Sequence, residues 1–453
     1  MTALQPARPG PPAKPAPRRI PFPVVDEISR HCLRAEEPET VHIEVHLPRQ
    51  PDPERLRAAF GEALRRHPRI LVREAPGPWY RRRYEWELTG TPDVDPVAFP
   101  EPGPGALELA RAGALAEAPP LSVSPPVRLE VVRPSPTGSA CVLLLTLNHT
   151  ALDGPACLRV LATAAELYGG AADSPTSPVR NPVGASGPEP RSPGRTVGPG
   201  RPARVAPAPG VPGAGGNGLL LADLPVPRRP AGARYTVNDQ LLVATCLMVA
   251  RWNRLRESAP RPMRITVPID DRPRGAEMPI GNGTRLVEVG FGTRECAREP
   301  GPQALAALLR RTAERTRALK SAPRPQLGHA ATFLTAPALP VGMRAALTRG
   351  LRRAAAPWTS TTLLSNIGRI PYPLDFAEAG RAEAVWFSAP AAMPRGLTVT
   401  TASTRGRLHL ALRWSRALLD DTAGQQLCGF FAEYLAAMSA MAALPAVSGD
   451  DGP

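Results

Sequence analysis

The stretch LTLNHTALDG, residues 145–154, decides how this chain is interpreted. It begins with apolar residues typical of a β-strand, passes through a short polar turn, and leads to Pro155, which suits the first turn of a helix. His149 therefore stands at a strand end, where an imidazole with a pKa near ~6.5 can accept a proton from a nucleophile. Asp153 can fold back or pair with an arginine, and Gly154 permits a tight exit. A purely structural histidine is the alternative for this short pattern alone, because HxxxDG recurs by chance.

Strands and helices are mixed on both sides of this stretch. VHIEVHL (residues 41–47) alternates like a strand, and Asp52-Pro53-Glu54 opens an amphipathic helix that ends near His67. The other predicted strands are 80–86, 127–132, 141–147, 264–269, 360–364, 383–387, 397–401 and 408–414, and the other predicted helices are 155–168, 236–252, 302–320, 341–353 and 420–438. This mixture predicts an α/β (α+β) fold.

Composition divides the chain into two halves. Residues 173–218 contain 11 Pro and 10 Gly and no aromatic residue, so we expect a flexible linker that cannot bury enough surface to order itself. Residues 1–20 are basic and Pro-rich and are expected to form a disordered tail. The two predicted subdomains are 21–172, which carries the HxxxDG stretch, and 219–442, which is followed by a short tail over 443–453.

Composition and charge exclude several classes of protein. The six cysteines are scattered singly, without the spacing of a zinc module or a disulfide framework, so a reduced, cytoplasmic protein is expected. The apolar runs are far shorter than the ~18 residues of a membrane span, and the N-terminus lacks the apolar segment of a secretory signal. The net charge of +15 is not gathered in a basic stripe with stacking aromatic residues, so nucleic-acid binding ranks last. A cationic field can equally attract the phosphates of coenzyme A or an acidic carrier protein.

The motif does not stand alone. Residues 145–154 resemble the HHxxxDG motif of the chloramphenicol-acetyltransferase-like superfamily, which includes peptide-synthetase condensation domains, polyketide-associated acyltransferases and wax ester synthases. Further segments that resemble the family follow in its order: LRAAFGEALRRHPRIL (56–71), YTVNDQLLVATCLMVARW (235–252), TVPIDDRPRGAEMPIGN (266–282) and SNIG (365–368). The resemblance covers the chain from about Pro21 to Ala442.

The resemblance implies two subdomains that meet in a V, with the motif in a channel between them. In such enzymes the second histidine of HH acts as general base or positions the nucleophile, and that position is His149 here. The motif aspartate, Asp153, supports the loop through an ion pair with an arginine, for which Arg272 and Arg285 are the candidates. The first histidine is replaced by Asn148, and we expect acyl transfer to be retained because the chemistry is assigned to the second. Changed packing or changed chemistry at Asn148 is the alternative.

Two other pairs of residues match the family. Ser365 and Asn366 resemble a segment beside the channel and could donate hydrogen bonds to a developing oxyanion, with a role in a turn as the alternative. Asn238 and Asp239 begin a helix, where Asn or Asp is an ordinary N-cap. The six histidines outside the motif have no spacing that suggests a metal site.

The implied function is a free-standing acyltransferase or condensation enzyme. It would transfer an acyl group from acyl-CoA, or from the phosphopantetheine arm of a carrier protein acting in trans, to a small-molecule alcohol or amine. The product would be an ester or amide in secondary-metabolite or lipid biosynthesis, and the reaction requires no bound metal or redox cofactor. The alternative is a non-catalytic, condensation-like module that recruits a carrier or partner protein, although such modules typically lose the motif His or Asp.

Overall fold

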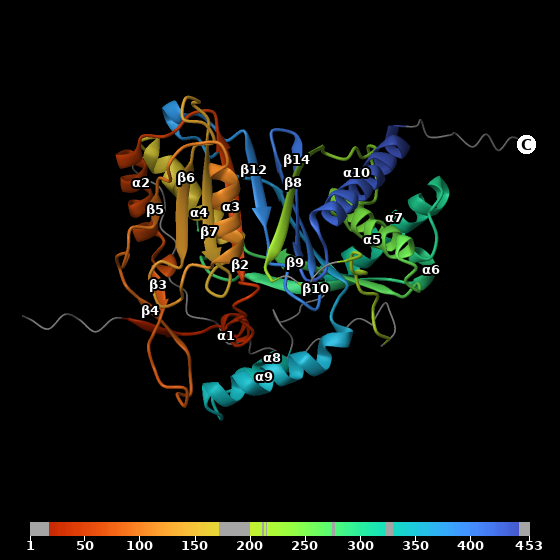
Figure 1. The fold of residues 1–453 in the computed structure, drawn as a ribbon, viewed down its shortest axis with the longest axis horizontal. Helices are drawn as coiled ribbons and strands as arrows, with labels where there is room; N and C mark the ends of the chain where they lie inside the picture. The colour runs from red at the N-terminus through yellow and green to blue at the C-terminus, as the bar shows by residue number, and fades with distance from the viewer. Residues whose placement is uncertain are drawn as a thin grey trace, which may run out of the picture.

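The computed structural model describes residues 18–171, 200–210, 213, 215–273, 277–321 and 329–443. Two halves lie side by side, and each contains a large β-sheet with helices packed on it (Figure 1). This arrangement confirms the expected mixed α/β fold. No helix in the described part of the chain has the length and apolar character needed to cross a bilayer.

The first half is built on a five-stranded sheet in the order β12-β2-β7-β6-β5. The strands are β2 (Thr40–Leu47), β5 (Val97–Ala98), β6 (Val127–Val132), β7 (Cys141–Asn148) and β12 (Ala384–Ser388). The central strand β7 is buried along its whole length between β2 and β6. Because β7 ends at Asn148, the motif loop starts in the middle of one edge of this sheet.

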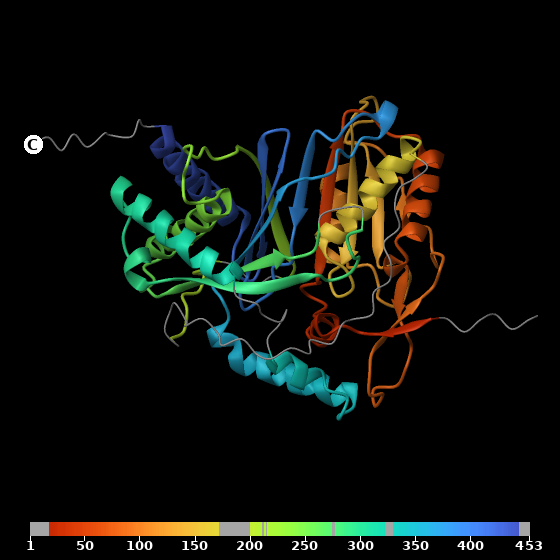
Figure 2. The ribbon, with the colours of Figure 1, turned by 180° about the vertical axis from the view of Figure 1, so that it is seen from behind.

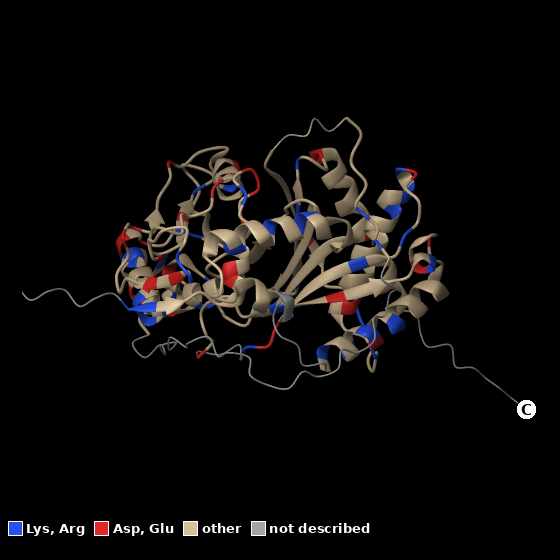
Figure 3. Ribbon diagram, turned by 90° about the horizontal axis from the view of Figure 1, so that it is seen from below, with Lys and Arg blue, Asp and Glu red and all other residues tan. Residues whose placement is uncertain are grey.

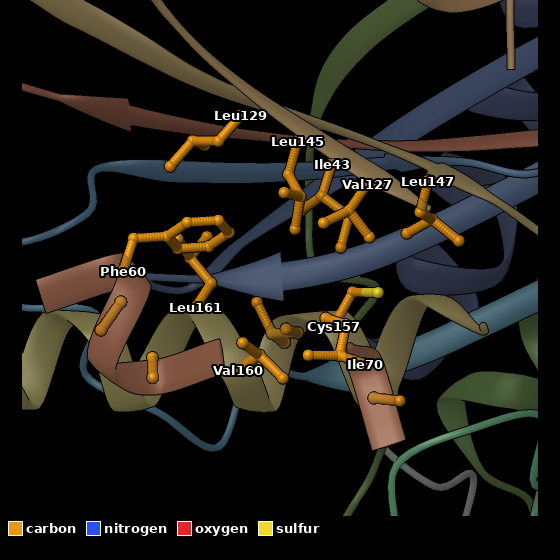
Figure 4. Close-up of a cluster of buried hydrophobic side chains, with 14 of the residues drawn as sticks. Ile43, Phe60, Ile70, Val127, Leu129, Leu145, Leu147, Cys157, Val160 and Leu161 are labelled. Atoms are coloured by element: carbon orange, nitrogen blue, oxygen red, sulfur yellow. The ribbon is translucent and has the colours of Figure 1, made fainter. Parts of the chain in front are cut away.

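Helices cover both faces of the first sheet: α3 (Ala106–Ala116) lies on the face seen in Figure 1, and α4 (Gly154–Tyr168) on the face seen in Figure 2. The third helix is α2 (Pro53–Arg66). Asp52 caps α2 by accepting a hydrogen bond from the backbone N of Arg55 at 2.8 Å. Phe60 of α2 and Leu161 of α4 are buried in the same cluster as Leu145 of β7, as Figure 4 shows. This core fixes the end of β7 relative to the start of α4, and hence the motif loop.

A small sheet and a short helix lie at the lower end of the first half. They comprise β1 (Arg19–Pro21), α1 (Val24–His31), the 3-10 helix η1 (Pro68–Ile70), β3 (Val72–Glu74) and β4 (Glu85–Leu88), with the strand order β1-β4-β3. Two predictions are corrected here. Ile20 is buried and pairs with Trp86, so the ordered chain begins before residue 21, and the strand predicted over 80–86 instead begins at Glu85.

The second half contains a six-stranded sheet in the order β10-β9-β11-β13-β14-β8. Its strands are β8 (Asn217–Pro225), β9 (Met263–Asp270), β10 (Thr284–Phe291), β11 (Thr362–Arg369), β13 (Leu397–Thr404) and β14 (Arg407–Ser415). Its helices are α5 (Val237–Leu255), α6 (Thr293–Cys296), α7 (Pro302–Ser321) and α10 (Asp421–Ala443). The long helix α5 is buried along nearly its whole length in the core of this half.

Two parts of the predicted second subdomain, 219–442, belong to the first half. Strand β12 pairs with β2 in antiparallel register, so it covers the edge that β2 would otherwise expose. Helices α8 (His329–Thr335) and α9 (Val341–Ala355) pack against α1, below the body of the protein in Figure 1. The 3-10 helices η2 (Ala356–Trp358) and η3 (Ala377–Ala379) complete the described elements.

The C-terminal part of the predicted linker is also corrected. Val205 and Ala206 are buried in the core of the second half. The side chain of Asn253 on α5 accepts a hydrogen bond from the backbone N of Ala206 at 2.9 Å and donates one to the carbonyl of Arg204 at 2.7 Å. Small side chains and a satisfied backbone allow this Pro-rich segment to pack, which composition alone does not reveal. The predicted linker residues 173–199 lie outside the described residues, as do most of the two predicted tails.

Candidate active site

The motif loop joins β7 to α4 and is shaped by Asn148. The side chain of this buried residue accepts a hydrogen bond from the backbone N of Thr150 at 3.0 Å and donates one to the carbonyl of Pro119 at 3.0 Å. Its own carbonyl accepts from the backbone N of Ala151 at 3.1 Å. Asn148 therefore closes the turn that presents the next residue, and both polar atoms of its side chain are hydrogen-bonded in doing so.

His149 lies at the wall of a cavity and is held by three contacts. Its backbone N donates to the carbonyl of Glu39 at 2.8 Å, and its carbonyl accepts from Asn282 at 3.1 Å. The ring Nδ1 lies 2.9 Å from the carbonyl of Leu152. Because a carbonyl can only accept, Nδ1 carries a proton, and in the neutral form of the ring the lone pair is therefore on Nε2. Within the described residues Nε2 has no hydrogen-bond partner, so it is available to a group in the cavity.

Asp153 ties the loop to the second half. One carboxylate oxygen caps α4 by accepting from the backbone N of Ala156 at 3.0 Å, and the other accepts from Arg272 at 2.7 Å and from the backbone N of Gly283 at 2.9 Å. Arg272 also pairs with Asp270 at 2.8 Å. Burial lowers the pKa of Arg272, but the two carboxylates outweigh this effect and raise it above its ordinary value. The guanidinium is thus a permanent charge that joins the two halves beside the motif.

Arg285, the other candidate partner, does not contact Asp153. It pairs with Asp271 at 2.5 Å and donates to the carbonyl of Lys320 at 3.4 Å. Strand alternation explains this, because the cavity-lining residues Thr284 and Leu286 flank Arg285 in β10. Arg285 therefore points to the opposite face of the sheet.

Gly154 allows the start of α4 to approach the strands β12 and β2 of the first sheet closely. A Cβ atom at this position would lie 3.1 Å from the ring of Phe387 on β12 and 3.7 Å from Val41 on β2. The first turn of α4 can therefore sit directly against the strand pair only because residue 154 has no side chain.

Two residues that sequence reasoning missed support the loop from the far side. The Asn282 amide donates to the carbonyls of both His149 and Thr150, at 3.1 and 3.0 Å, and to the carboxylate of Asp26 at 2.9 Å. Asp26 is fully buried, and burial raises its pKa to about 6 although Arg69, Asn282 and Trp86 act in the opposite direction. In the sequence, Asn282 stands between two glycines, a pattern that indicates close backbone packing and could have drawn attention to this residue.

The cavity beside His149 has a volume of about 580 Å³ and lies between the two halves. Its lining from the first half and β12 includes Val25, Ile28, Val41, His149, Gly154 and Phe387, and its lining from the second half includes Val267, Ile269, Leu286, Leu363, Ser365, Asn366 and Thr400. Polar and charged residues from several segments line it as well, among them Ser29, Glu39, Asn238, Asp270, Thr284 and Lys320. This volume and lining suit an acyl chain or a drug-sized molecule.

The structure brings Ser365 and Asn366 to the cavity on β11, so they belong to a strand and not to a turn. The Asn366 side chain is largely occupied, because its oxygen accepts from Gly368 N and Thr401 Oγ1 and its nitrogen donates to Asn238. The hydroxyl of Ser365 makes no hydrogen bond to the described residues and remains free to donate into the cavity.

Asn238 and Asp239 differ in what they do at the start of α5. The N-cap is Thr236, and Asp239 completes a reciprocal capping box with it by accepting from its backbone N at 2.7 Å. Asp239 is therefore structural. Asn238 lines the cavity and accepts the hydrogen bond from Asn366 at 3.2 Å.

Charged residues of both signs line the cavity. The cations are Lys320, Arg352 and Arg395, and the carboxylates are Glu39, Asp153 and Asp270, of which the two aspartates are paired with Arg272. The guanidinium of Arg395 donates to Ser360 Oγ at 3.1 Å and to Thr266 Oγ1 at 3.4 Å and forms no ion pair with the described residues. Burial lowers the pKa of Arg395 to about 10. Sequence reasoning gave no signal for this residue, since one arginine among many is not distinguishable by pattern. Among the described residues no cluster of three or more His, Cys, Asp or Glu side chains could hold a metal ion.

Solved structures of known proteins share this fold over nearly the whole chain. The trichothecene 15-O-acetyltransferase of Fusarium sporotrichioides has a TM-score of 0.62 and 13% identity, covering 93% of this chain and 95% of that one. The condensation domain of the monacolin K polyketide synthase has a TM-score of 0.60 and 13% identity, and the match covers 95% of this chain and 98% of that domain. The starter condensation domain of rhizomide synthetase was solved in complex with C8-CoA. It has a TM-score of 0.60 and 13% identity, and the match covers 94% of this chain and 95% of that chain. The chain therefore has the fold of the chloramphenicol-acetyltransferase-like superfamily, as the motif resemblance implied.

By sequence, the chain is similar to uncharacterized proteins from two strains of Mycobacterium tuberculosis. Each is 28% identical to it over 382 residues, which cover 78% of this chain and 84% of the relative. No protein-family model matches the chain.

Proposed function

We propose that this protein is an acyltransferase that moves an acyl group from a thioester to the hydroxyl or amine of a small molecule. The observation that carries the proposal is the arrangement of His149. Its Nδ1 proton is committed to Leu152, and its free Nε2 lies at the wall of a cavity between the two halves. A neutral imidazole held in this tautomer is a suitable general base.

The proposed reaction uses two residues of the cavity wall. Nε2 of His149 takes the proton from the acceptor O–H or N–H as the oxygen or nitrogen attacks the thioester carbonyl carbon. The hydroxyl of Ser365 donates a hydrogen bond to the oxyanion of the tetrahedral intermediate. Collapse breaks the C–S bond, and the imidazolium returns its proton to the departing thiolate. The ester or amide and a free thiol are the products, so atoms and charge balance.

The donor is proposed to be acyl-CoA or an acyl group on a carrier protein in trans, in secondary-metabolite or lipid biosynthesis. The positive side chains at the cavity support a donor that carries phosphates. A neighbour in fold, the starter condensation domain of rhizomide synthetase, binds C8-CoA, which agrees with this proposal.

The test compares the purified protein with its His149→Ala variant on a panel of acyl-CoA and acyl-carrier donors and small acceptors, with products detected by mass spectrometry. We expect the variant to be folded by circular dichroism and to lose on the order of 10²–10⁴-fold in rate. His46→Ala is the matched control, because His46 is also a partly buried histidine but does not line the cavity. It should keep the wild-type rate.

The alternative function is a non-catalytic module that recruits a carrier or partner protein. It would be favoured if the His149→Ala variant turned over the substrates at the wild-type rate, because the motif would then only shape the cavity. It would also be favoured if the wild-type protein bound a carrier protein without turning over any thioester that the carrier bears.

A further inference from the structure

Exposed hydrophobic side chains are concentrated on one side of the molecule. Of the twelve large hydrophobic side chains that are exposed in the described residues, eight lie on α8, α9, the loop between these two helices, η2 and the loop between β3 and β4, at the bottom of Figure 1. These are Trp79, Tyr80, Phe333, Leu339, Met343, Leu347, Leu351 and Trp358. We call this side the lower face. Single exposed hydrophobic residues are ordinary, but such a concentration marks an interaction surface.

The centre of the lower face is an apolar stripe on α9. Met343, Leu347 and Leu351 follow one another at intervals of four residues, so they lie along one face of the helix. They are between 48% and 51% exposed. The opposite side of α9 is anchored in the protein, because Arg344 and Thr348 are buried and Arg344 forms an ion pair with Glu27 at 2.9 Å. The stripe is therefore held outward by a fixed helix.

The loop between β3 and β4 extends this surface beyond the start of α9. The backbone N of Gly342 donates to the carbonyl of Trp79 at 3.0 Å, and the backbone N of Val341 donates to the carbonyl of Arg81 at 2.8 Å. A Cβ atom at position 342 would lie 3.1 Å from the Trp79 ring. Trp79 thus packs against the start of α9, although the residue remains 68% exposed.

The lower face is also strongly cationic. Four exposed arginines lie on this side and form no ion pair with the described residues; they are Arg82 and Arg83 in the loop and Arg349 and Arg353 on α9. Arg349 and Arg353 follow Leu347 and Leu351 by two residues, so they lie about 200° around the helix from the stripe. Residues 75–84 and 329–361 contain no Asp or Glu. Figure 3 views the protein from this side, with Lys and Arg in blue. A second copy of the chain would present the same positive charge, so this surface calls for an anionic partner.

We propose that the lower face docks on a lipid surface with anionic headgroups. A helix with aliphatic residues on one side and arginines on another, flanked by exposed Trp and Tyr, has the composition of helices that lie in the membrane interface. The 15 residues of α9 give it a length of about 22 Å along that surface. Arg352 belongs to α9 and also lines the cavity, so docking would place the cavity next to the lipid. This proposal does not depend on the acyl-transfer function.

The test is a flotation experiment with the full chain and phospholipid vesicles. We expect the protein to float with vesicles of phosphatidylcholine and phosphatidylglycerol, and to float less at high salt or with phosphatidylcholine alone. Arg349→Gln with Arg353→Gln should lower the partition coefficient by roughly 25-fold, since each arginine near an anionic surface contributes about fivefold. Leu347→Ser with Leu351→Ser should lower it by on the order of tenfold, because apolar burial in the interface is lost.

Matched controls change exposed residues elsewhere on the protein. Leu109→Ser with Leu255→Ser removes two leucines that are 76% and 60% exposed, and Arg261→Gln with Arg310→Gln removes two exposed arginines. Both controls should float like the wild type.

Three results would overturn the proposal. The first is a wild-type protein that does not float with anionic vesicles, or lower-face variants that float as well as it does. The second is a dimer in light scattering that the leucine substitutions dissociate, which would make the lower face an interface between copies. The third is binding of a purified acidic acyl carrier protein through the lower face without any binding to vesicles.

Discussion

Replacing Asp153 by alanine removes three hydrogen bonds from a buried position between the two halves. The carboxylate accepts from the backbone N of Ala156, from the backbone N of Gly283 and from Arg272, and the residue is 2% exposed. The substitution therefore tests whether the motif aspartate acts by supporting the loop.

The expected loss follows from the individual contacts. Loss of the helix cap costs about 1 kcal/mol. The partly buried amide of Gly283 loses its partner, which costs about 1–3 kcal/mol. Arg272 would still be paired with Asp270 and hydrogen-bonded to the carbonyls of Pro279 and Gly281. The loss of its bond to Asp153 should therefore cost about as much as an ordinary hydrogen bond, about 1 kcal/mol. The sum, about 3–5 kcal/mol, is a large part of the roughly 5–15 kcal/mol that stabilises a folded protein.

Urea unfolding followed by circular dichroism measures this loss. Asp153→Asn should lose less than Asp153→Ala, because asparagine caps a helix as well as aspartate does. His149→Ala should stay within about 1 kcal/mol of the wild type, because the imidazole is only half buried and makes one side-chain hydrogen bond. If Asp153→Ala also unfolded within 1 kcal/mol of the wild type, the loop would not depend on the ion pair and the supporting role of Asp153 would be wrong.

Three further substitutions test other buried groups by the same measurement. Burial raises the pKa of Asp26 from 3.8 to about 6, so folding favours the protonated carboxyl. This contribution to stability is fully present below pH ~4 and is lost as the pH rises through ~6. The stability of Asp26→Asn relative to the wild type should therefore improve by about 3 kcal/mol between pH 4 and pH 8, and a constant difference would contradict the assignment. Arg395→Met should be as stable as the wild type or more so, because the Ser360 and Thr266 hydroxyls also bond each other at 2.6 Å and no group is orphaned; a loss above 2 kcal/mol would contradict this. Asn148→His should fold but lose about 1–3 kcal/mol, because one of its two backbone partners stays unsatisfied, and unchanged stability would show that the loop repacks.

Much of the local structure could be predicted from the sequence, because local signals determine it. The end of β7, the turn and the start of α4 are specified by an apolar run, a capping aspartate and a proline within some twenty residues. The Asp153–Arg272 pair was one of two predicted alternatives. Choosing between Arg272 and Arg285 required the register of β10, which sets the face on which Arg285 lies.

The remaining supports of the site come from contacts between segments far apart in the chain. Asn282 reaches His149 across 133 positions, and the lone amide carries no pattern that identifies its partner. Arg395 reaches the cavity because the chain passes from β12 in the first sheet back to β13 in the second. The chain crosses over because β12 pairs with the edge strand β2 of the first sheet. Which strand forms that edge is decided only when the sheet assembles, so no single segment of the sequence reveals it.

The position of one half against the other is itself part of the candidate site. The loop with His149 belongs to the first half, but Arg272, Asn282 and Ser365 belong to the second. The same contact is held on another side by Arg413 of β14, which donates to the carbonyl of Thr40 at 2.7 Å and to its hydroxyl at 2.9 Å. Burial lowers the pKa of Arg413 to about 9, so the protein keeps a costly buried cation at this junction. Because Thr40 pairs directly with Asn148, the residue that closes the motif turn, this junction sets the geometry around His149 without touching the cavity.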